Sequence, residues 1–138
     1  MNTGNTNLSD DDFVRAFLAG AILPGEFHHR DHLRLAWGVV RQRGATDAED
    51  AITTGIRRYA THHGQAAKYH DTMTRFWVRL VAHAQAARPE LAPFDRFIAA
   101  FPWLLDTALP YRHWSRAAMD GTTARAGWVE PDVLALPA

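Results

Sequence analysis

Apolar residues recur at spacings of three and four along most of this chain, which is the pattern of helices that bury one face. The clearest case is His29–Arg43, which Gly44 follows as a helix terminator. No segment shows the sustained alternation of apolar and polar residues that is typical of a strand on a half-buried sheet. The periodicity therefore predicts an all-α protein.

The periodic stretches divide the chain into four main helices and a more broken C-terminal part. Two segments, Ser9–Asp12 and Thr46–Glu49, have the capping-box pattern that opens a helix. We expect main helices at about Asp10–Ala19, His29–Arg43, Thr46–Gly64 and His70–Arg88, and short ones at Pro93–Phe101, Leu104–Leu109 and Ser115–Ala126. An extended tail, Trp128–Ala138, should follow.

Short connections make successive helices antiparallel, so the sequence predicts a single-domain antiparallel helical bundle. We expect this domain to span residues 9–138. The polar segment Met1–Leu8 precedes the first capping signal, and we expect it to be a disordered tail.

The composition limits the kinds of partner that we expect. Of the 138 residues, 47% are hydrophobic and 22% charged, which is typical of a globular domain. Fifteen basic residues balance fifteen acidic ones, so nothing favours a nucleic acid or a membrane surface as partner. No cysteine is present, which excludes disulfides and thiolate ligands. Without a signal core or a long apolar run, we expect a cytoplasmic protein.

Six of the eight histidines lie between His28 and His70. A helical projection places His29 and His32 on the apolar face of the second helix. It places His63 and His70 on the apolar faces of the third and fourth helices. In an up-and-down bundle the start of the second helix, the end of the third and the start of the fourth meet at one end. The sequence therefore predicts that these four histidines converge.

A metal ion is the partner that such a cluster favours. Each buried polar group without a partner costs on the order of 1–3 kcal/mol, and neutral imidazole is a common metal ligand. We therefore predict a divalent metal site formed by His29, His32, His63 and His70, with Zn²⁺, Fe²⁺ or Cu²⁺ favoured over Mg²⁺ and Ca²⁺. The alternative for each histidine is a core residue that bonds a backbone carbonyl, and the spacing leaves that alternative open.

Three polar residues beside His70 are candidate catalytic residues. Tyr69 could transfer a proton, or it could simply pack at the helix start. Asp71 could orient a ligand imidazole or cap the helix. Lys68 is the only lysine, and it could bind an anion or form a Schiff base, or it could be a solvated side chain.

Four segments together resemble a family of small all-helical bacterial proteins, namely Phe27–Trp37, His63–Gly64, Lys68–Thr72 and Trp128–Asp132. Members of that family carry Phe-x-His-Arg-x-His-Leu, then His-Gly, then Lys-Tyr-His-(Glu/Asp)-Thr. The likeness covers most of the chain and includes the four histidines of the predicted metal site. It implies a shared histidine motif and no particular activity. Asp71 stands where Glu is commoner in the family, which shortens the reach of the carboxylate.

These observations predict a small metal-dependent enzyme that acts on a small-molecule substrate at one end of the bundle. With Zn²⁺, a bound water would be acidified for hydrolysis, hydration or elimination, and with Fe²⁺ or Cu²⁺ oxygen chemistry would be open. One alternative is a metal-free acid–base isomerase or cyclase that uses the same histidines with Tyr69. Another is a non-catalytic metal- or ligand-binding module. The sequence leaves the oligomeric state open, and a homodimer is compatible with it.

Overall fold

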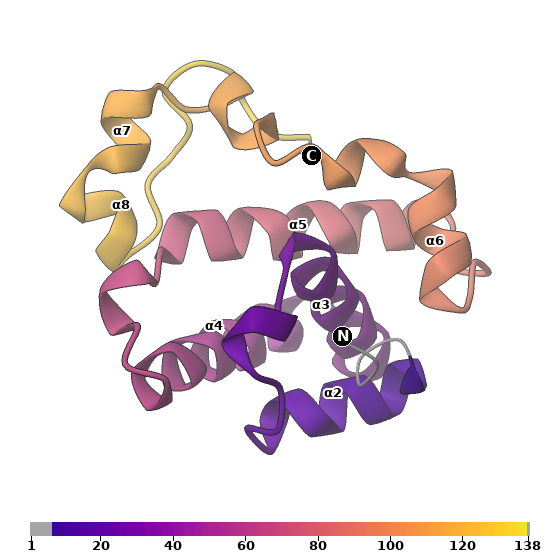
Figure 1. Ribbon diagram of the computed structural model, residues 1–138. Helices are drawn as coiled ribbons and strands as arrows, with labels where there is room; N and C mark the ends of the chain where they lie inside the picture. Colours follow the sequence, from indigo (N-terminus) through magenta and orange to yellow (C-terminus); the bar gives the residue numbers. More distant parts are fainter. Residues whose placement is uncertain (1–6, 138) are drawn as a thin grey trace.

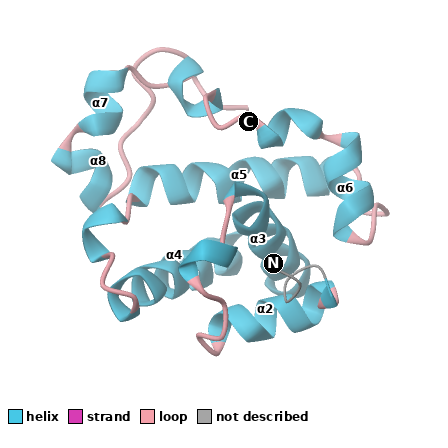
Figure 2. Ribbon diagram, in the orientation of Figure 1, coloured by secondary structure: helices cyan, strands magenta, loops and turns pink. Residues whose placement is uncertain are grey.

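The computed structural model describes residues 7–137, and within them it contains helices and loops but no strand (Figure 2). The α-helices are α2 (Asp10–Leu18), α3 (His29–Arg43), α4 (Ala45–His62), α5 (Asp71–Ala87), α6 (Phe94–Ala100), α7 (Arg116–Asp120) and α8 (Thr122–Ala126). The 3₁₀ helices are η1 (Pro24–Glu26), η2 (Ala66–Lys68), η3 (Pro102–Leu105) and η4 (Leu109–Arg112). The predicted all-α class is confirmed. Most of the predicted N-terminal tail lies outside the described residues.

Three mutually packed helices, α3, α4 and α5, form the centre of the molecule. Helices α2 and α6 pack against α3, and α8 packs against α5. Figure 1 shows α2 on one side of α5, and α7 and α8 on the other. One continuous core joins both sides, and its largest fully buried side chains are Trp37, Trp114, Phe13, Phe76, Phe94 and Phe97. Among the described helices, none has the length and apolar character to cross a membrane.

The predicted boundaries of the first helices are largely confirmed, and one predicted cap is wrong. The Ser9 hydroxyl accepts a hydrogen bond from the backbone N–H of Asp12, as the capping pattern predicts. Helix α3 has the predicted bounds, and Gly44 follows it with a left-handed φ of 84°. Thr46 does not cap α4, because α4 begins at Ala45 with Gly44 as its N-cap. A connection of one residue places Thr46 inside the helix.

The C-terminal part differs from the prediction between α6 and α7. The helix predicted over Leu104–Leu109 is replaced by the two 3₁₀ helices η3 and η4, each with a proline in its first turn. Beyond α8 the chain runs back on the α7 side of α5 as an extended strap (Figure 1). The Thr72 hydroxyl donates to the Gly127 carbonyl, and the Trp114 indole donates to the Val129 carbonyl. The strap therefore closes the core on the side of α5 that faces α7.

Gly38 marks a close approach of α2 to α3. A Cβ atom at this position would lie 2.7 Å from Cγ2 of Val14, closer than side-chain carbons approach each other. Gly55 of α4 provides a contrast, because its Cβ would meet Phe17 at 3.5 Å, an ordinary contact. Helix α2 can therefore lie against α3 as it does only because residue 38 lacks a side chain.

We predict that Gly38→Ala lowers the free energy of unfolding by about 1–2 kcal/mol, although alanine has the higher helix propensity. The reason is that Val14 is β-branched and has little freedom to move aside. The matched control Gly55→Ala should instead raise stability by up to about 1 kcal/mol. Urea denaturation followed by circular dichroism measures both. Equal stabilisation of the two variants would show that α2 moves away from α3 freely.

A candidate ligand site lined by three histidines

A cavity of about 270 Å³ lies between α3, α4 and α5. We call it the three-histidine pocket, and its lining consists of His29, His32, Ala36, Ile52, Ile56, His70, Met73, Thr74, Trp77 and Val78. Three of the four histidines in the predicted cluster thus line the same pocket. Among the described residues, no carboxylate, lysine or arginine lines the pocket. Its polar chemistry is supplied by imidazoles and one hydroxyl in walls that are otherwise mostly apolar.

His29 is the first residue of α3, and its ring is fixed from two sides. Nε2 lies 2.9 Å from the Leu104 carbonyl oxygen, and the Trp77 ring packs edge-on against the imidazole at a centroid distance of 4.5 Å. A carbonyl oxygen only accepts hydrogen bonds, so Nε2 donates, and with a single proton on the ring Nδ1 keeps its lone pair. Nδ1 has no hydrogen-bond partner within residues 7–137. His29 therefore offers an oriented acceptor.

His32 lies one turn further along α3, on the same face. Its ring packs against Phe27 at a centroid distance of 4.0 Å, and it makes no hydrogen bond to any described residue. Burial is the main cause that lowers the pKa of His32 to about 4, and the Coulombic interaction with the neighbouring His29 acts in the same direction. The ring is therefore neutral at physiological pH, with one nitrogen as donor and the other as acceptor.

His70 is the N-cap of α5 and is hydrogen-bonded through both ring nitrogens. Nδ1 accepts from the backbone N–H of Met73 at 3.0 Å, and Nε2 donates to the Met119 carbonyl at 2.7 Å. The sequence prediction placed His70 inside the helix, whereas the helix begins one residue later. The ring forms part of the pocket wall, and it also joins the start of α5 to α7.

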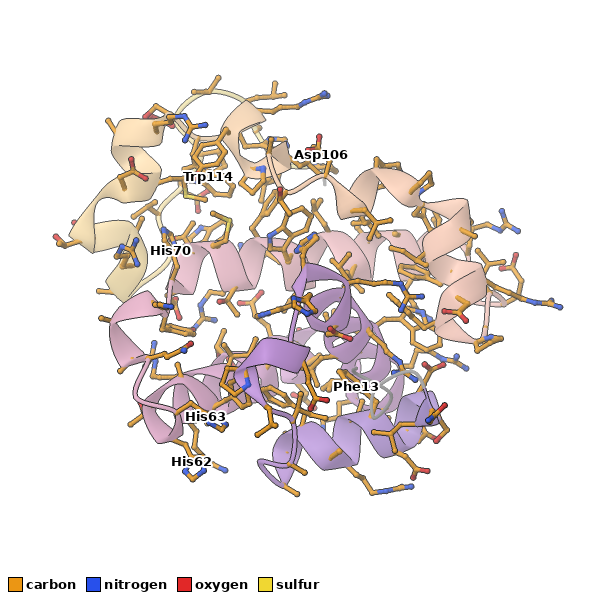
Figure 3. The ribbon with its side chains drawn as sticks, viewed as in Figure 1. Phe13, His62, His63, His70, Asp106 and Trp114 are labelled. Atoms are coloured by element: carbon orange, nitrogen blue, oxygen red, sulfur yellow. The ribbon has the colours of Figure 1, made fainter. Side chains whose placement is uncertain are left out.

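His63 does not line the three-histidine pocket. It follows the end of α4, where its ring packs against Tyr59 and His62 at centroid distances of 4.5 and 4.9 Å. Figure 3 shows His62 and His63 well separated from His70. The part of α4 that reaches the pocket is its middle, through Ile52 and Ile56, rather than its end. The Nε2 atom of His63 is buried without a hydrogen-bond partner among the described residues.

The positions of these histidines do not form a complete metal site among the described residues. Within residues 7–137, no group of three or more histidine or acidic side chains has an arrangement that could hold a metal ion. His70 has no free lone pair while it caps α5 and donates to Met119. His29 and His32 are the pocket imidazoles with unpaired nitrogens, and a metal site built on them stays a prediction.

Two of the other candidate residues, Tyr69 and Asp71, belong to an ion network around the buried Asp71 carboxylate. Asp71 is buried in the first turn of α5, where its oxygens accept from the Tyr69 hydroxyl at 2.7 Å, Arg75 at 2.7 Å and Arg57 at 3.2 Å. Asp71 therefore neither orients an imidazole nor supplies the side-chain cap of the helix. It joins α5 to α4 instead. Lys68 is exposed at the end of η2.

The network controls the ionisation of its members. Burial alone would raise the pKa of Asp71, but hydrogen bonds from Tyr69 and Arg75 and the neighbouring guanidinium charges lower it overall. The pKa of Glu49, which accepts from Arg75 and Arg79, is lowered in the same way. Burial and the Asp71 carboxylate raise the pKa of Tyr69 to about 12. Its phenol therefore holds its proton tightly.

Sequence reasoning missed the arginine partners in this network and the two backbone carbonyls that bind His29 and His70. The Asp71–Arg75 pair was detectable, because an acidic and a basic residue four apart are neighbours on a helix. The carbonyls of Leu104 and Met119 carry no sequence signal, since every residue has one.

Comparison with protein-family models, curated proteins and solved structures finds no match for this chain. The likeness to a bacterial family therefore stays a prediction.

We predict that Asp71→Asn lowers the free energy of unfolding by about 1–2 kcal/mol at pH 7, because it removes the charge from the hydrogen bonds that Arg57, Arg75 and Tyr69 donate to this buried side chain. A carboxyl with a lowered pKa stabilises the fold above its unfolded pKa of about 4, and this contribution is lost as the pH falls through the lower folded value. The deficit should thus shrink below about pH 4. Guanidinium chloride denaturation between pH 3 and 7 measures it, with the exposed Asp50→Asn as control. A deficit independent of pH would contradict this account.

Proposed function

We propose that this protein binds a small, mostly apolar molecule in the three-histidine pocket and that this molecule is its substrate. The observation that carries the proposal is the presence of two imidazoles, His29 and His32, with unpaired nitrogens at a cavity between three packed helices. The unpaired nitrogens of these two side chains are not among the fully buried unpaired atoms of the described residues, so a ligand in the pocket can reach them and form hydrogen bonds with them.

The size and lining of the pocket support a compact ligand. Apolar cavities of about 150 Å³ hold benzene, and ligand pockets of drug-sized molecules run from roughly 300 to 1,000 Å³. A cavity of about 270 Å³ therefore suits one ring with a substituent or an aliphatic molecule of similar size. The walls formed by Ile52, Ile56 and Trp77 favour an apolar body.

The pocket geometry also limits which residues could transfer a proton in a metal-free acid–base mechanism. Efficient proton transfer needs a group whose pKa lies near the working pH, and the pKa of His32 is lowered to about 4. His32 is thus better suited to hydrogen bonding than to proton abstraction. Tyr69 donates its hydroxyl proton to Asp71 and does not line the pocket. His29 is the candidate for proton transfer that remains in this mechanism.

We predict that single-ring probes such as toluene, phenol and anisole, at millimolar concentration, raise the Tm of the wild-type protein by mass action. Ala36→Leu should abolish this response, because Ala36 lines the pocket and the larger side chain fills it. The control Ala99→Leu makes the same change at an exposed position of α6 and should respond like the wild type. Thermal melting with and without each probe measures the effect. No response in the wild type, or equal responses of the two variants, would refute the proposed site.

A metal-dependent enzyme is our second proposal, and the spacing of His29 and His32 favours it. Two histidines three residues apart on one helix can bind the same ion. Because the pKa of His32 is low, protons do not compete for its nitrogens at neutral pH. A bound ion would supply an acidified water to the pocket. His70 could join the two ligands only by giving up one of its backbone hydrogen bonds.

For this second proposal we expect tag-free protein to bind one Zn²⁺ or Co²⁺ ion per chain in calorimetric titrations. His29→Ala and His32→Ala should each weaken binding at least tenfold, whereas His63→Ala and the exposed His83→Ala should leave it unchanged. Chelation should preserve the helical circular dichroism and the cooperative melting, because the core is built from apolar side chains. If the wild-type protein binds no metal ion, or if His32→Ala binds it as tightly as the wild type, the proposed metal site is refuted.

A further inference from the structure

We propose that the ligand of the three-histidine pocket is an uncharged molecule that carries a hydroxyl group, a phenol or an alcohol. Its hydroxyl would donate to Nδ1 of His29 and accept from the N–H of His32. This inference rests on the proposed function, because it names the chemical class of the molecule in the same pocket.

The hydrogen-bond inventory of the pocket favours a ligand with a donor. His29 has its proton fixed on Nε2 by the Leu104 carbonyl, so it presents only an acceptor. Thr74 also presents an acceptor, because its hydroxyl proton is donated to the His70 carbonyl at 2.8 Å. His70 presents neither, since both of its nitrogens are engaged.

His32 supplies the complementary donor. As a neutral ring without a partner among the described residues, it has one N–H and one lone pair. The pocket therefore contains more acceptors than donors. A ligand hydroxyl satisfies both kinds, because one oxygen atom donates its proton to one imidazole and accepts from the other. An ether or a ketone would leave the His29 lone pair unpaired.

The charges around the pocket favour an uncharged ligand. The charged side chains in the first turn of α3 are engaged elsewhere, because Arg30 pairs with Asp95 and Asp31 accepts from the His28 backbone N–H. The acidic and basic groups of α4 and α5 that we described pair with each other in the ion network. A buried carboxylate or ammonium ligand would find no opposite charge in the lining and would lose its hydration.

The walls fit a flat or compact ring beside these polar atoms. The Trp77 ring adjoins the His29 imidazole, and Met73 contributes a polarisable thioether to the same side of the lining. Ile52 and Ile56 of α4 form the aliphatic wall. A ring body can therefore occupy the apolar part of the cavity while its hydroxyl lies between the two histidines.

The test compares probes that differ only at the polar group. We expect phenol to bind the wild-type protein at least tenfold more tightly than anisole in calorimetric titrations at pH 7. Methylation removes the donor and leaves a buried acceptor unpaired, which costs about that factor. Cyclohexanol should bind more tightly than cyclohexanone by a similar factor. Benzoate and benzylamine should each bind more weakly than phenol.

Two variants locate the preference on the imidazoles. His32→Phe keeps an aromatic ring and removes both nitrogens, and it should reduce the phenol-to-anisole ratio to below about twofold. His29→Phe should do the same, and because it also leaves the Leu104 carbonyl without its donor, its folding is checked by circular dichroism. The exposed His83→Gln is the control and should keep the wild-type ratio.

The outcomes separate this inference from the function on which it rests. If anisole, cyclohexanone or benzoate binds as tightly as the hydroxyl compound, and Ala36→Leu abolishes that binding, the hydroxyl assignment is overturned while the pocket remains the ligand site. If the phenol-to-anisole ratio is unchanged in His32→Phe, the assignment is also overturned. If no probe binds the wild-type protein, both proposals fail.

Discussion

Two adjacent residues, His70 and Asp71, fix the position at which α5 begins. The His70 ring accepts from the backbone of α5 and donates to the carbonyl of Met119 at the end of α7. The Asp71 carboxylate is directed to the other side, where arginines of α4 and α5 and the Tyr69 hydroxyl surround it. The start of the central helix is thus held to the C-terminal segments on one side and to α4 on the other. Both residues place polar atoms inside the protein, and each has its hydrogen bonds met.

The three-histidine pocket depends on this anchoring. One wall is formed by residues in the first two turns of α5, so any shift of its start would move that wall relative to α3. On the opposite side, His29 is held by the Leu104 carbonyl of η3, a segment far along the chain. His32 lines the same pocket, packs against Phe27 and has no hydrogen bond of its own to a described residue. The pocket therefore combines two imidazoles that are held by hydrogen bonds with one that is held by packing alone.

The sequence predicted the helices well because their apolar periodicity and capping residues are local properties. The bounds of α3 and the Ser9 cap follow directly from the residues at those positions. The meeting of His29, His32 and His70 was also predictable, since it depends on the faces of two helices. The position of His63 was not predictable from the sequence. It depends on which part of α4 contacts the other two helices, and the packing of the three helices determines that part. The hydrogen bonds to backbone carbonyls were beyond prediction, because they join segments distant in the sequence.

The single-residue connection at Gly44 sets the rotation of α4 about its own axis. With no loop between α3 and α4, the first turn of α4 follows directly from the last turn of α3. Each residue of an α-helix advances the chain by about 100° around the axis. One residue more or fewer at this joint would turn Ile52 and Ile56 away from the histidines and bring polar neighbours such as Thr53 into their place. The chain length at this joint therefore determines which side chains form the third wall, and an insertion or deletion here would alter the pocket more than most single substitutions within it.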